Sequence, residues 1–316
     1  MTPLTQSLNL VFCGTPPFAV PTLETLVEGG YRIHLVVTQP DRPKGRGLEL
    51  VASPVKQSAL RLKLPVTQPD RIKSNDEFRA QLAAIQPDAI IVVGYGRLIP
   101  QWMLDLPRFG NINLHASLLP KYRGAAPIQW AIASGETVTG VTTMRLNAGL
   151  DTGDILLQRE FPIAFDDTSE TLSPRLAAIG ADLVVETLRG LAAFTLHSRP
   201  QDDSQATLAP ILKKEDGLID FVRSATEIYN RLRGFQPWPG AFTKFRSKNF
   251  QILRARPSGE ALPPAEIQTA HGRLLVGCGS QSSLELLEIQ IEGKKSTTAA
   301  DFIHGYRPKP GEKLGL

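Results

Sequence analysis

Cysteine is scarce in this sequence. The 316 residues include only Cys13 and Cys278, which lie far apart along the chain. One such pair provides neither a disulfide framework nor a cluster of Cys and His ligands for a metal ion. We therefore expect both cysteines to be core thiols and no metal to be bound.

Long apolar runs are also missing. No stretch approaches the roughly 18 residues that a membrane-spanning helix needs. The N-terminal residues 1–6, M-T-P-L-T-Q, lack the basic-then-apolar order of a signal peptide. These absences predict a cytoplasmic protein that has no membrane association.

The composition is that of a folded protein, and its charge is uneven. Hydrophobic residues make up 42% and charged residues 21% of the chain, which is close to the average for globular domains. Residues 221–316 hold 14 Lys/Arg against 8 Asp/Glu, whereas residues 1–220 hold 21 against 23. A basic C-terminal part favours a polyanionic partner such as nucleic acid, although a generic solvated surface would look the same.

The first half of the chain alternates apolar, strand-like runs with helical patterns. Such alternation predicts an α/β domain with a doubly wound, mostly parallel, Rossmann-like sheet. The expected strands are 8–13, 31–38, 88–93, 110–115, 139–146 and 154–163. The expected helices are 18–28, 54–63, 74–85, 125–134 and 169–194.

The pattern changes after a polar stretch at 198–210, which we interpret as a linker. It separates a predicted catalytic domain at 1–197 from a C-terminal domain at 211–316. That domain has one helical pattern, at 224–233, and then five short runs typical of strands, near 242–246, 250–255, 266–270, 273–277 and 284–291. Short strands at this spacing predict a small β-barrel of the OB-like kind.

The sequence lacks the motifs of several common enzyme classes. After the first predicted strand the chain reads Gly14-Thr-Pro-Pro, without the G-x-G-x-x-G of a nicotinamide-dependent dehydrogenase. Two prolines also stand where backbone N–H groups would have to hold a pyrophosphate. Because a P-loop, G-x-S-x-G and H-E-x-x-H are absent as well, the fold class alone names no reaction.

Two polar segments follow predicted strands, where ligands bind in open α/β sheets. Strand alternation turns Asn113 and His115 to the same side, and Asp151 lies in a turn flanked by Gly149 and Gly153. An amide and an imidazole can donate hydrogen bonds to a developing oxyanion, and a carboxylate can take a proton from an amine. The set suits acyl-type transfer, but a single His at a strand end is more often a structural hydrogen-bonding group.

The residues around these three resemble a known enzyme family. The run from Asn113 to Gly124, N-L-H-A-S-L-L-P-K-Y-R-G, with L-D-T-G-D at 150–154, resembles the signature of the folate-dependent formyltransferases. Further segments resemble the members that formylate methionine attached to tRNA. They are F-C-G-T-P-P-F at 12–18, T-Q-P-D-R-P-K-G-R-G at 38–47, G-A-A-P-I-Q at 124–129 and P-W-P at 237–239. The resemblance covers essentially the whole chain.

The resemblance implies a reaction and a set of residues. The formyl group of 10-formyltetrahydrofolate would pass to the α-amino group of methionine on initiator tRNA for translation initiation, without a covalent enzyme intermediate. Asn113, His115 and Asp151 match the family's catalytic set. Ser117, Leu118, Leu119 and Pro120 match the segment that holds the folate, and Tyr95 and Gly96 would line the pteridine pocket. No protein partner is implied.

The loop at 40–47 is rich in Gly and Pro and carries the cations Arg42, Lys44 and Arg46. Such a loop suits phosphates and a splayed acceptor end, and Arg46 matches the family's tRNA-contacting arginine. Relatives commonly continue with lysines where this chain has Leu48-Glu-Leu, which would weaken the electrostatic part of that contact. Lys213 and Lys214, beside the linker, are further candidates for phosphate contacts, although each cation alone is consistent with a plain surface charge.

Two other functions remain open on the sequence. A formyltransferase that acts on an amino sugar nucleotide or another small amine would share Asn113, His115 and Asp151. A pure RNA-binding module would leave these three residues without a role. The loop at 39–47 and the basic C-terminal domain favour the tRNA acceptor, because a small substrate requires neither.

Overall fold

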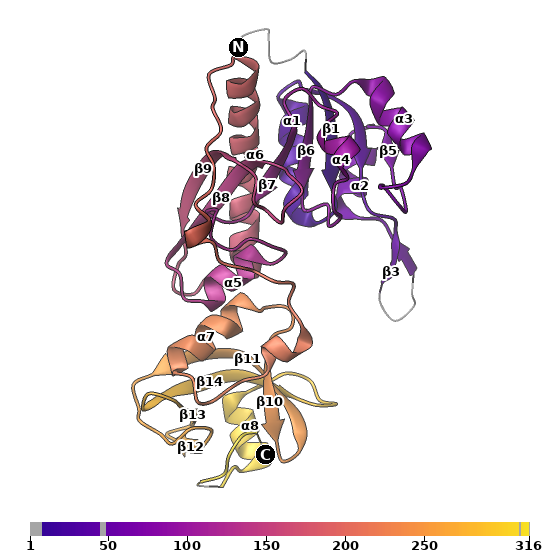
Figure 1. The fold of residues 1–316 in the computed structure, drawn as a ribbon. Coiled ribbons are helices and arrows are strands. Elements are labelled where there is room, and N and C mark those ends of the chain that lie inside the picture. The colour runs from indigo at the N-terminus through magenta and orange to yellow at the C-terminus, as the bar shows by residue number, and fades with distance from the viewer. Residues whose placement is uncertain (1–7, 45–48, 310, 316) are drawn as a thin grey trace. The chain divides into compact units, whose positions relative to one another are not determined.

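The chain folds into two compact units. Figure 1 shows the computed structural model, which describes residues 8–44, 49–309 and 311–315. The first unit runs to Pro127 and includes Val138–Pro162 and Ser173–Pro210. The second consists of Ile128–Thr137, Ile163–Leu172 and the chain from Ile211 onward. The units follow contacts in space, so they are discontinuous in sequence. The ranges 1–197, 198–210 and 211–316 stay predictions.

The first unit contains a seven-stranded sheet in the order β5-β2-β1-β6-β7-β8-β9. Neighbouring strands are parallel from β5 to β7, and β8 and β9 continue the sheet antiparallel. This arrangement confirms the predicted mostly parallel α/β sheet. The strands are β1 (Asn9–Gly14), β2 (Arg32–Val37), β5 (Val66–Thr67), β6 (Ala89–Val93), β7 (Asn111–His115), β8 (Val138–Arg145) and β9 (Ile155–Pro162).

Helices cover both faces of this sheet, and several begin at side-chain caps. Ser53 Oγ accepts from Lys56 N at the start of α2, and Asn75 Oδ1 accepts from Phe78 N at the start of α3. The 3₁₀ turn η2 (Pro17–Ala19) leads into the first helix. The helices of the first unit are α1 (Val20–Glu28), α2 (Pro54–Arg61), α3 (Asp76–Ile85), α4 (Gln101–Leu104) and, from Ser173 onward, α6 (Ser169–Ala192), whereas α5 (Pro127–Ala133) belongs to the second unit from Ile128 onward.

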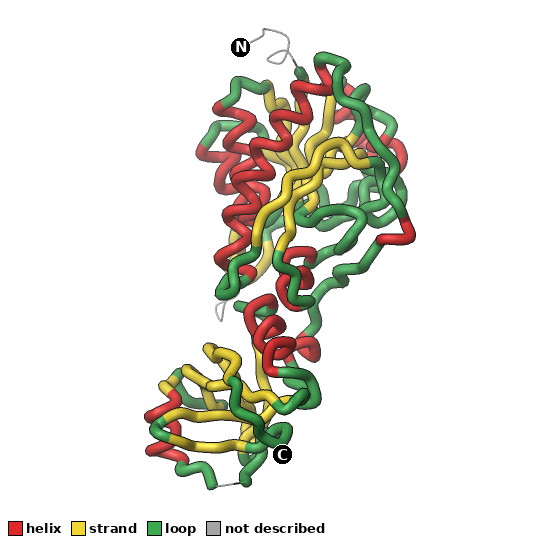
Figure 2. The backbone as a smooth tube through the Cα atoms, turned by 90° about the vertical axis from the view of Figure 1, so that its left-hand side faces the viewer, coloured by secondary structure: helices red, strands yellow, loops and turns green. Residues whose placement is uncertain are grey.

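The alternation of side chains along the strands decides which face carries the polar groups. Val11, Cys13 and Val92 pack in one cluster with side chains of α3 and α4. Leu114 points to the opposite face, where its side chain contacts Gly180 of α6, the long helix seen against the sheet in Figure 2. Asn113 pairs with Val92 across β7 and β6, so Asn113 and His115 lie on the α3/α4 side of the sheet.

The loop at 40–47 contains secondary structure that the sequence pattern did not predict. Its described parts form β3 (Arg42–Lys44) and β4 (Glu49–Val51), which pair antiparallel with each other. In Figure 1 this hairpin projects away from the seven-stranded sheet. At its base, Asp41 accepts hydrogen bonds from Lys56 Nζ at 2.6 Å and Gln68 Nε2 at 2.7 Å. These contacts lower the pKa of Asp41 and fix the point where the hairpin leaves the fold.

The second unit is built on an antiparallel sheet. Its strands have the order β10-β11-β14-β13-β12, with β15 beside β14, and Phe245, Phe250 and Phe302 meet in its core. Sequence patterns predicted the first helix and five of the strands, but not β15 or the last helix. The elements are α7 (Ala225–Gly234), β10 (Ala241–Phe245), β11 (Lys248–Ser258), β12 (Ile267–Ala270), β13 (Arg273–Cys278), β14 (Ser282–Ile291), β15 (Thr297–Thr298) and α8 (Ala299–Tyr306).

The C-terminal segment joins the two edges of this sheet. Ile267 N of β12 donates to Glu312 O at 2.7 Å, and Gly315 N donates to Lys244 O of β10 at 2.8 Å. A third bond, from Leu314 N to Ala265 O, measures 2.9 Å. The segment therefore connects the edge strands β10 and β12, which do not pair with each other in the described chain, and closure into the predicted small barrel stays a prediction.

The two cysteines are buried, free thiols, as expected. Burial raises the pKa of both thiols, and that of Cys278 reaches about 12, so neither is a thiolate near neutral pH. Within the described part of the chain, no helix has the length and apolar character needed to cross a membrane.

The ion pair between Arg246 and Glu312 fastens the C-terminal segment. Arg246 Nε and Nη2 lie 2.6 and 3.0 Å from the two carboxylate oxygens. Hydrogen bonds from Arg246 hold the pKa of Glu312 below its ordinary value. Because folding lowers this pKa, the pair stabilises the fold above the unfolded value of about 4.3. That contribution disappears as the pH falls through the folded value.

We expect Glu312→Gln to lower the free energy of unfolding by about 0.5–1 kcal/mol at pH 7. The difference from wild type should shrink as the pH falls below about 4.3, because the wild-type carboxyl then becomes protonated. Urea unfolding at pH 7 and at several acidic pH values measures both effects. Glu160→Gln, at an exposed carboxylate of β9, serves as the control. A difference that grows on acidification would contradict the assignment.

Candidate active site

The structure brings an imidazole and a carboxylate together at the end of β7. His115 is the last residue of β7 and Asp151 lies in the turn between β8 and β9. His115 Nδ1 and Asp151 Oδ2 are 3.7 Å apart, and their side chains are 6% and 14% exposed. Asn113 is buried two residues before His115 on the same strand and therefore faces the same side.

A backbone carbonyl sets the orientation of His115. His115 Nε2 lies 2.9 Å from Tyr122 O. Because a carbonyl only accepts, Nε2 carries a proton in this contact. Nδ1 is then the ring atom that faces Asp151. The 3.7 Å separation is an ion-pair distance rather than a hydrogen bond.

The turn that carries Asp151 has an unusual backbone. Asp151 has φ +50°, in the left-handed region, and its Oδ2 accepts a hydrogen bond from Gly124 N at 2.9 Å. A Cβ at Gly153 would lie 1.7 Å from Arg145 O, so only glycine permits this approach to β8. The turn therefore aims its carboxylate at the segment that follows β7.

The segment Ser117–Pro120 is held by β8 and β9. Ser117 and Leu119 are buried, whereas Leu118 and Pro120 are only partly covered. Leu119 N donates to Thr142 Oγ1 at 3.2 Å, and Gln158 Nε2 donates to Leu119 O at 2.8 Å. Sequence reasoning missed Thr142 and Gln158, because ordinary strand residues carry no motif that marks them as supports for a distant loop.

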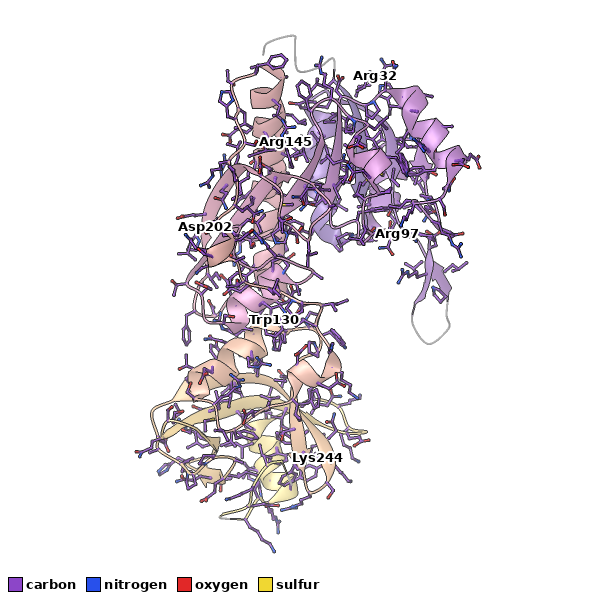
Figure 3. The ribbon with its side chains drawn as sticks, in the orientation of Figure 1. Arg32, Arg97, Trp130, Arg145, Asp202 and Lys244 are labelled. Atoms are coloured by element: carbon purple, nitrogen blue, oxygen red, sulfur yellow. The ribbon has the colours of Figure 1, made fainter. Side chains whose placement is uncertain are left out.

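Tyr95 and Gly96 follow β6 near the centre of the sheet. The Tyr95 side chain is 1% exposed and belongs to the core cluster with Val92 and Met103. Tyr95 therefore offers almost no surface to a ligand, whereas Gly96 is exposed. Gln39 Nε2 donates to Tyr95 O at 2.8 Å and to Gly96 O at 3.4 Å. Arg97, labelled in Figure 3, marks this turn.

The predicted tRNA contacts are distributed over both units. Arg42 is exposed on β3, and its Nη2 donates to Gln39 Oε1 at 2.8 Å. Lys44 belongs to β3 by its backbone, its side chain is not described, and Arg46 lies outside the described residues. Lys213 and Lys214 are exposed in the second unit, where Lys214 begins the 3₁₀ turn η4 (Lys214–Gly217). A common surface formed by the five cations stays a prediction.

The chemistry available at the end of β7 is that of acyl transfer. Asn113 and a protonated His115 can donate hydrogen bonds to an oxyanion, and Asp151 can accept a proton from an amine. In the described ranges, no three His, Cys, Asp or Glu residues are grouped so as to hold a metal ion.

Comparison with known families matches both parts of the chain. The model of the formyl transferase family matches residues 8–188, and that of the formyl transferase C-terminal domain matches residues 211–307. A protein of Koribacter versatilis named methionyl-tRNA formyltransferase is 67% identical over 97% of this chain and 98% of its own length. A Geobacter sulfurreducens protein of the same name is 47% identical over 98% of this chain and 97% of its own length.

Solved structures share the fold at low sequence identity. An N-formyltransferase from Helicobacter canadensis, in complex with folinic acid and dTDP-3-aminofucose, superposes with a TM-score of 0.66 at 17% identity. The match covers 88% of this chain and 98% of that one. HypX from Aquifex aeolicus, in complex with tetrahydrofolic acid, gives 0.62 at 18% identity over 97% of this chain and 48% of its own.

Gly96 is constrained by its backbone and by a neighbouring side chain. It has φ +75°, and a Cβ there would lie 2.6 Å from Gln39 Nε2. We expect Gly96→Ala to lower the free energy of unfolding by about 1–2 kcal/mol through the backbone, with a further loss from the displaced Gln39 amide. Gly272→Ala is the matched control, since Gly272 has φ +78° and open space at its Cβ position. Equal losses in urea unfolding would refute the contact with Gln39.

Proposed function

The chain belongs to the formyl transferase family, and we propose from this premise that it formylates the methionine carried by initiator tRNA. The donor would be 10-formyltetrahydrofolate, and the products tetrahydrofolate and N-formylmethionyl-tRNA. The observation that carries the proposal is the full-length match to proteins named methionyl-tRNA formyltransferase, at 47–67% identity. The close His115–Asp151 pair beside Asn113 supports it chemically.

The proposed chemistry is direct attack of the amine on the formyl carbon. The methionine nitrogen forms a bond to that carbon, and the carbonyl electrons move to oxygen. Asn113 and His115 donate hydrogen bonds to this oxyanion, each contributing about 10²–10³-fold in rate. Asp151 takes the surplus proton from the attacking nitrogen. When the oxyanion collapses, the bond to folate N10 breaks, and N10 receives the proton that Asp151 took from the amine.

The proposed donor site combines two backbone segments of the first unit. Residues Ser117–Pro120 carry the folate beside the catalytic pair, and hydrogen bonds to Leu119 from Thr142 and Gln158 support that position. Tyr95 and Gly96 line the pteridine pocket, where Gly96 is the exposed member and Tyr95 is buried beneath it.

The proposed acceptor site is cationic. Arg42, Lys44, Arg46, Lys213 and Lys214 contact phosphates of the tRNA, and the basic surplus of residues 221–316 supports a polyanionic substrate. The reaction serves translation initiation in the cytoplasm. A sugar-nucleotide or other small-amine acceptor would leave this charge unused.

We expect Asn113→Ala and His115→Ala each to lower kcat by about 10²–10³-fold, because each removes one oxyanion donor. The affinity for tRNA should not change, since neither side chain belongs to the cationic surface. Single-turnover formylation and a filter-binding titration measure the two quantities. Wild-type turnover by Asn113→Ala would refute the role assigned to its amide.

We expect the wild-type protein to formylate charged initiator tRNA and not a UDP-amino sugar. Binding of the tRNA should weaken steeply between about 50 and 200 mM salt, as counterions are released from phosphates.

Arg42→Ala should reduce the slope of log K against log salt by about one if the Arg42 side chain contacts one phosphate. Glu160→Ala, which removes an exposed carboxylate, is the control for a change of one unit in the net charge of the protein. Salt-independent binding, or formylation of the sugar alone, would rule out the tRNA acceptor.

A further inference from the structure

Gln201 lies in the polar stretch that the sequence predicts as a linker, yet it contacts the turn of Asp151. Gln201 Nε2 donates to Asp151 O at 2.8 Å and to Gly153 O at 2.7 Å. Its Oε1 accepts from Arg123 Nε at 3.0 Å and Nη2 at 2.8 Å. We propose that Gln201 is a positioning residue that holds the Asp151 carboxylate in place for proton removal. The proposal rests on the proposed formyl transfer.

Arg123 fixes which way the Gln201 amide points. A guanidinium only donates hydrogen bonds, so the amide oxygen must face Arg123 and the amide nitrogen must face the turn. Arg123 is 7% exposed, and its charge is paired with Asp203, whose carboxylate lies 2.7 Å away and is 81% exposed. The buried cation therefore presents the two N–H groups of Gln201 to the carbonyls of residues 151 and 153.

The turn needs such support because its backbone is unfavourable. Asp151 has φ +50°, a conformation that residues other than glycine occupy at a cost. Gln201 binds the carbonyl of Asp151 itself and that of Gly153, on the other side of Thr152. Loss of these two bonds frees the turn to relax, and the carboxylate then moves away from His115.

The neighbours of Arg123 touch the same catalytic pair. Tyr122 O contacts His115 Nε2, and Gly124 N donates to Asp151 Oδ2. Gln201, Arg123 and the two chain neighbours of Arg123 thus link the turn to the imidazole in one ring of contacts. The distance between Asp151 and His115 is set by that ring.

The stretch that carries Gln201 is fastened at both ends. Arg199 pairs with Ile155 of β9 through two backbone hydrogen bonds of 2.8 and 2.9 Å. Arg123 N donates to Thr207 O at 2.8 Å, and Ala209 N donates to Arg123 O at 2.7 Å. Figure 3 labels Asp202, the residue after Gln201, in the part of the first unit that contains β9. The backbone that carries Gln201 is therefore held in place on both sides of this residue.

Gln201→Glu separates a positioning role from simple packing around Arg123. A carboxylate keeps the shape of the side chain and accepts from Arg123, but it has no N–H to donate to the two carbonyls. We expect Gln201→Glu and Gln201→Ala to lower kcat by about 10–100-fold, as displacement of a catalytic group by about 1 Å does. KM for the folate and for the acceptor should stay within about twofold. Wild-type kcat in Gln201→Glu would overturn the proposal.

Gln205→Ala is the matched control, because Gln205 is an exposed amide of the same stretch that bonds only to Asp202 in the described contacts. It should keep wild-type kcat and KM. The effect of Gln201→Glu is then measured again in an Asp151→Ala background. If Gln201 acts through Asp151, the second substitution adds little to the first. A full multiplicative loss would show that Gln201 acts elsewhere and would overturn the proposal.

Hydrogen exchange tests the same contact without turnover. The Gly124 amide donates to Asp151 Oδ2, so it should exchange at least severalfold faster in Gln201→Glu and not in Gln205→Ala. Unchanged exchange would overturn the proposal even if tRNA is the right acceptor. If wild type formylates only the sugar nucleotide, the proposed function fails, and the kcat comparison with that acceptor still decides the role of Gln201. Should Gln201→Ala fail to fold, Gln201→Glu carries the test.

Discussion

The approach of the Asp151 carboxylate to His115 is the constraint on which the candidate active site depends. The two side chains come from segments on opposite sides of β8 in sequence, and their separation of 3.7 Å is maintained by several backbone contacts. Tyr122 O orients the imidazole, and Gly124 N holds the carboxylate. Each contact fixes one degree of freedom before substrate arrives, which is how an enzyme lowers the reorganisation needed in the transition state.

Similar side-chain to backbone hydrogen bonds are found around the proposed donor site. Side chains of strands and loops bind backbone carbonyls of the segments that would meet the folate: Gln158 binds Leu119 O, and Gln39 binds Tyr95 O and Gly96 O. Three amide side chains, including Gln201, thus brace three loops. An amide suits this task because it donates and accepts at once without adding charge near the reacting groups.

The sequence predicted the parallel sheet well and the supporting contacts poorly. The runs around Leu10 and Ile91 are apolar on both faces, and only a sheet covered by helices accommodates them. Short elements escaped prediction because two or three residues are too few to show a periodic pattern: β3 and β4 have three residues each, and β15 has two. Thr142 and Gln201 escaped for a related reason, since their partners are backbone atoms remote in sequence.

By itself, the sequence determined the α/β class, the strand β7 and the side that Asn113 and His115 share, because these follow from local periodicity and from the two-residue repeat of a strand. Its motifs also pointed to the family to which the chain belongs. Only the tertiary structure decided that Asp151 reaches His115, that Glu312 to Gly315 join β10 and β12, and that residues 199–209 brace the turn of Asp151 instead of only connecting two domains. These contacts join residues tens of positions apart, and no local pattern encodes the folding path that brings them together.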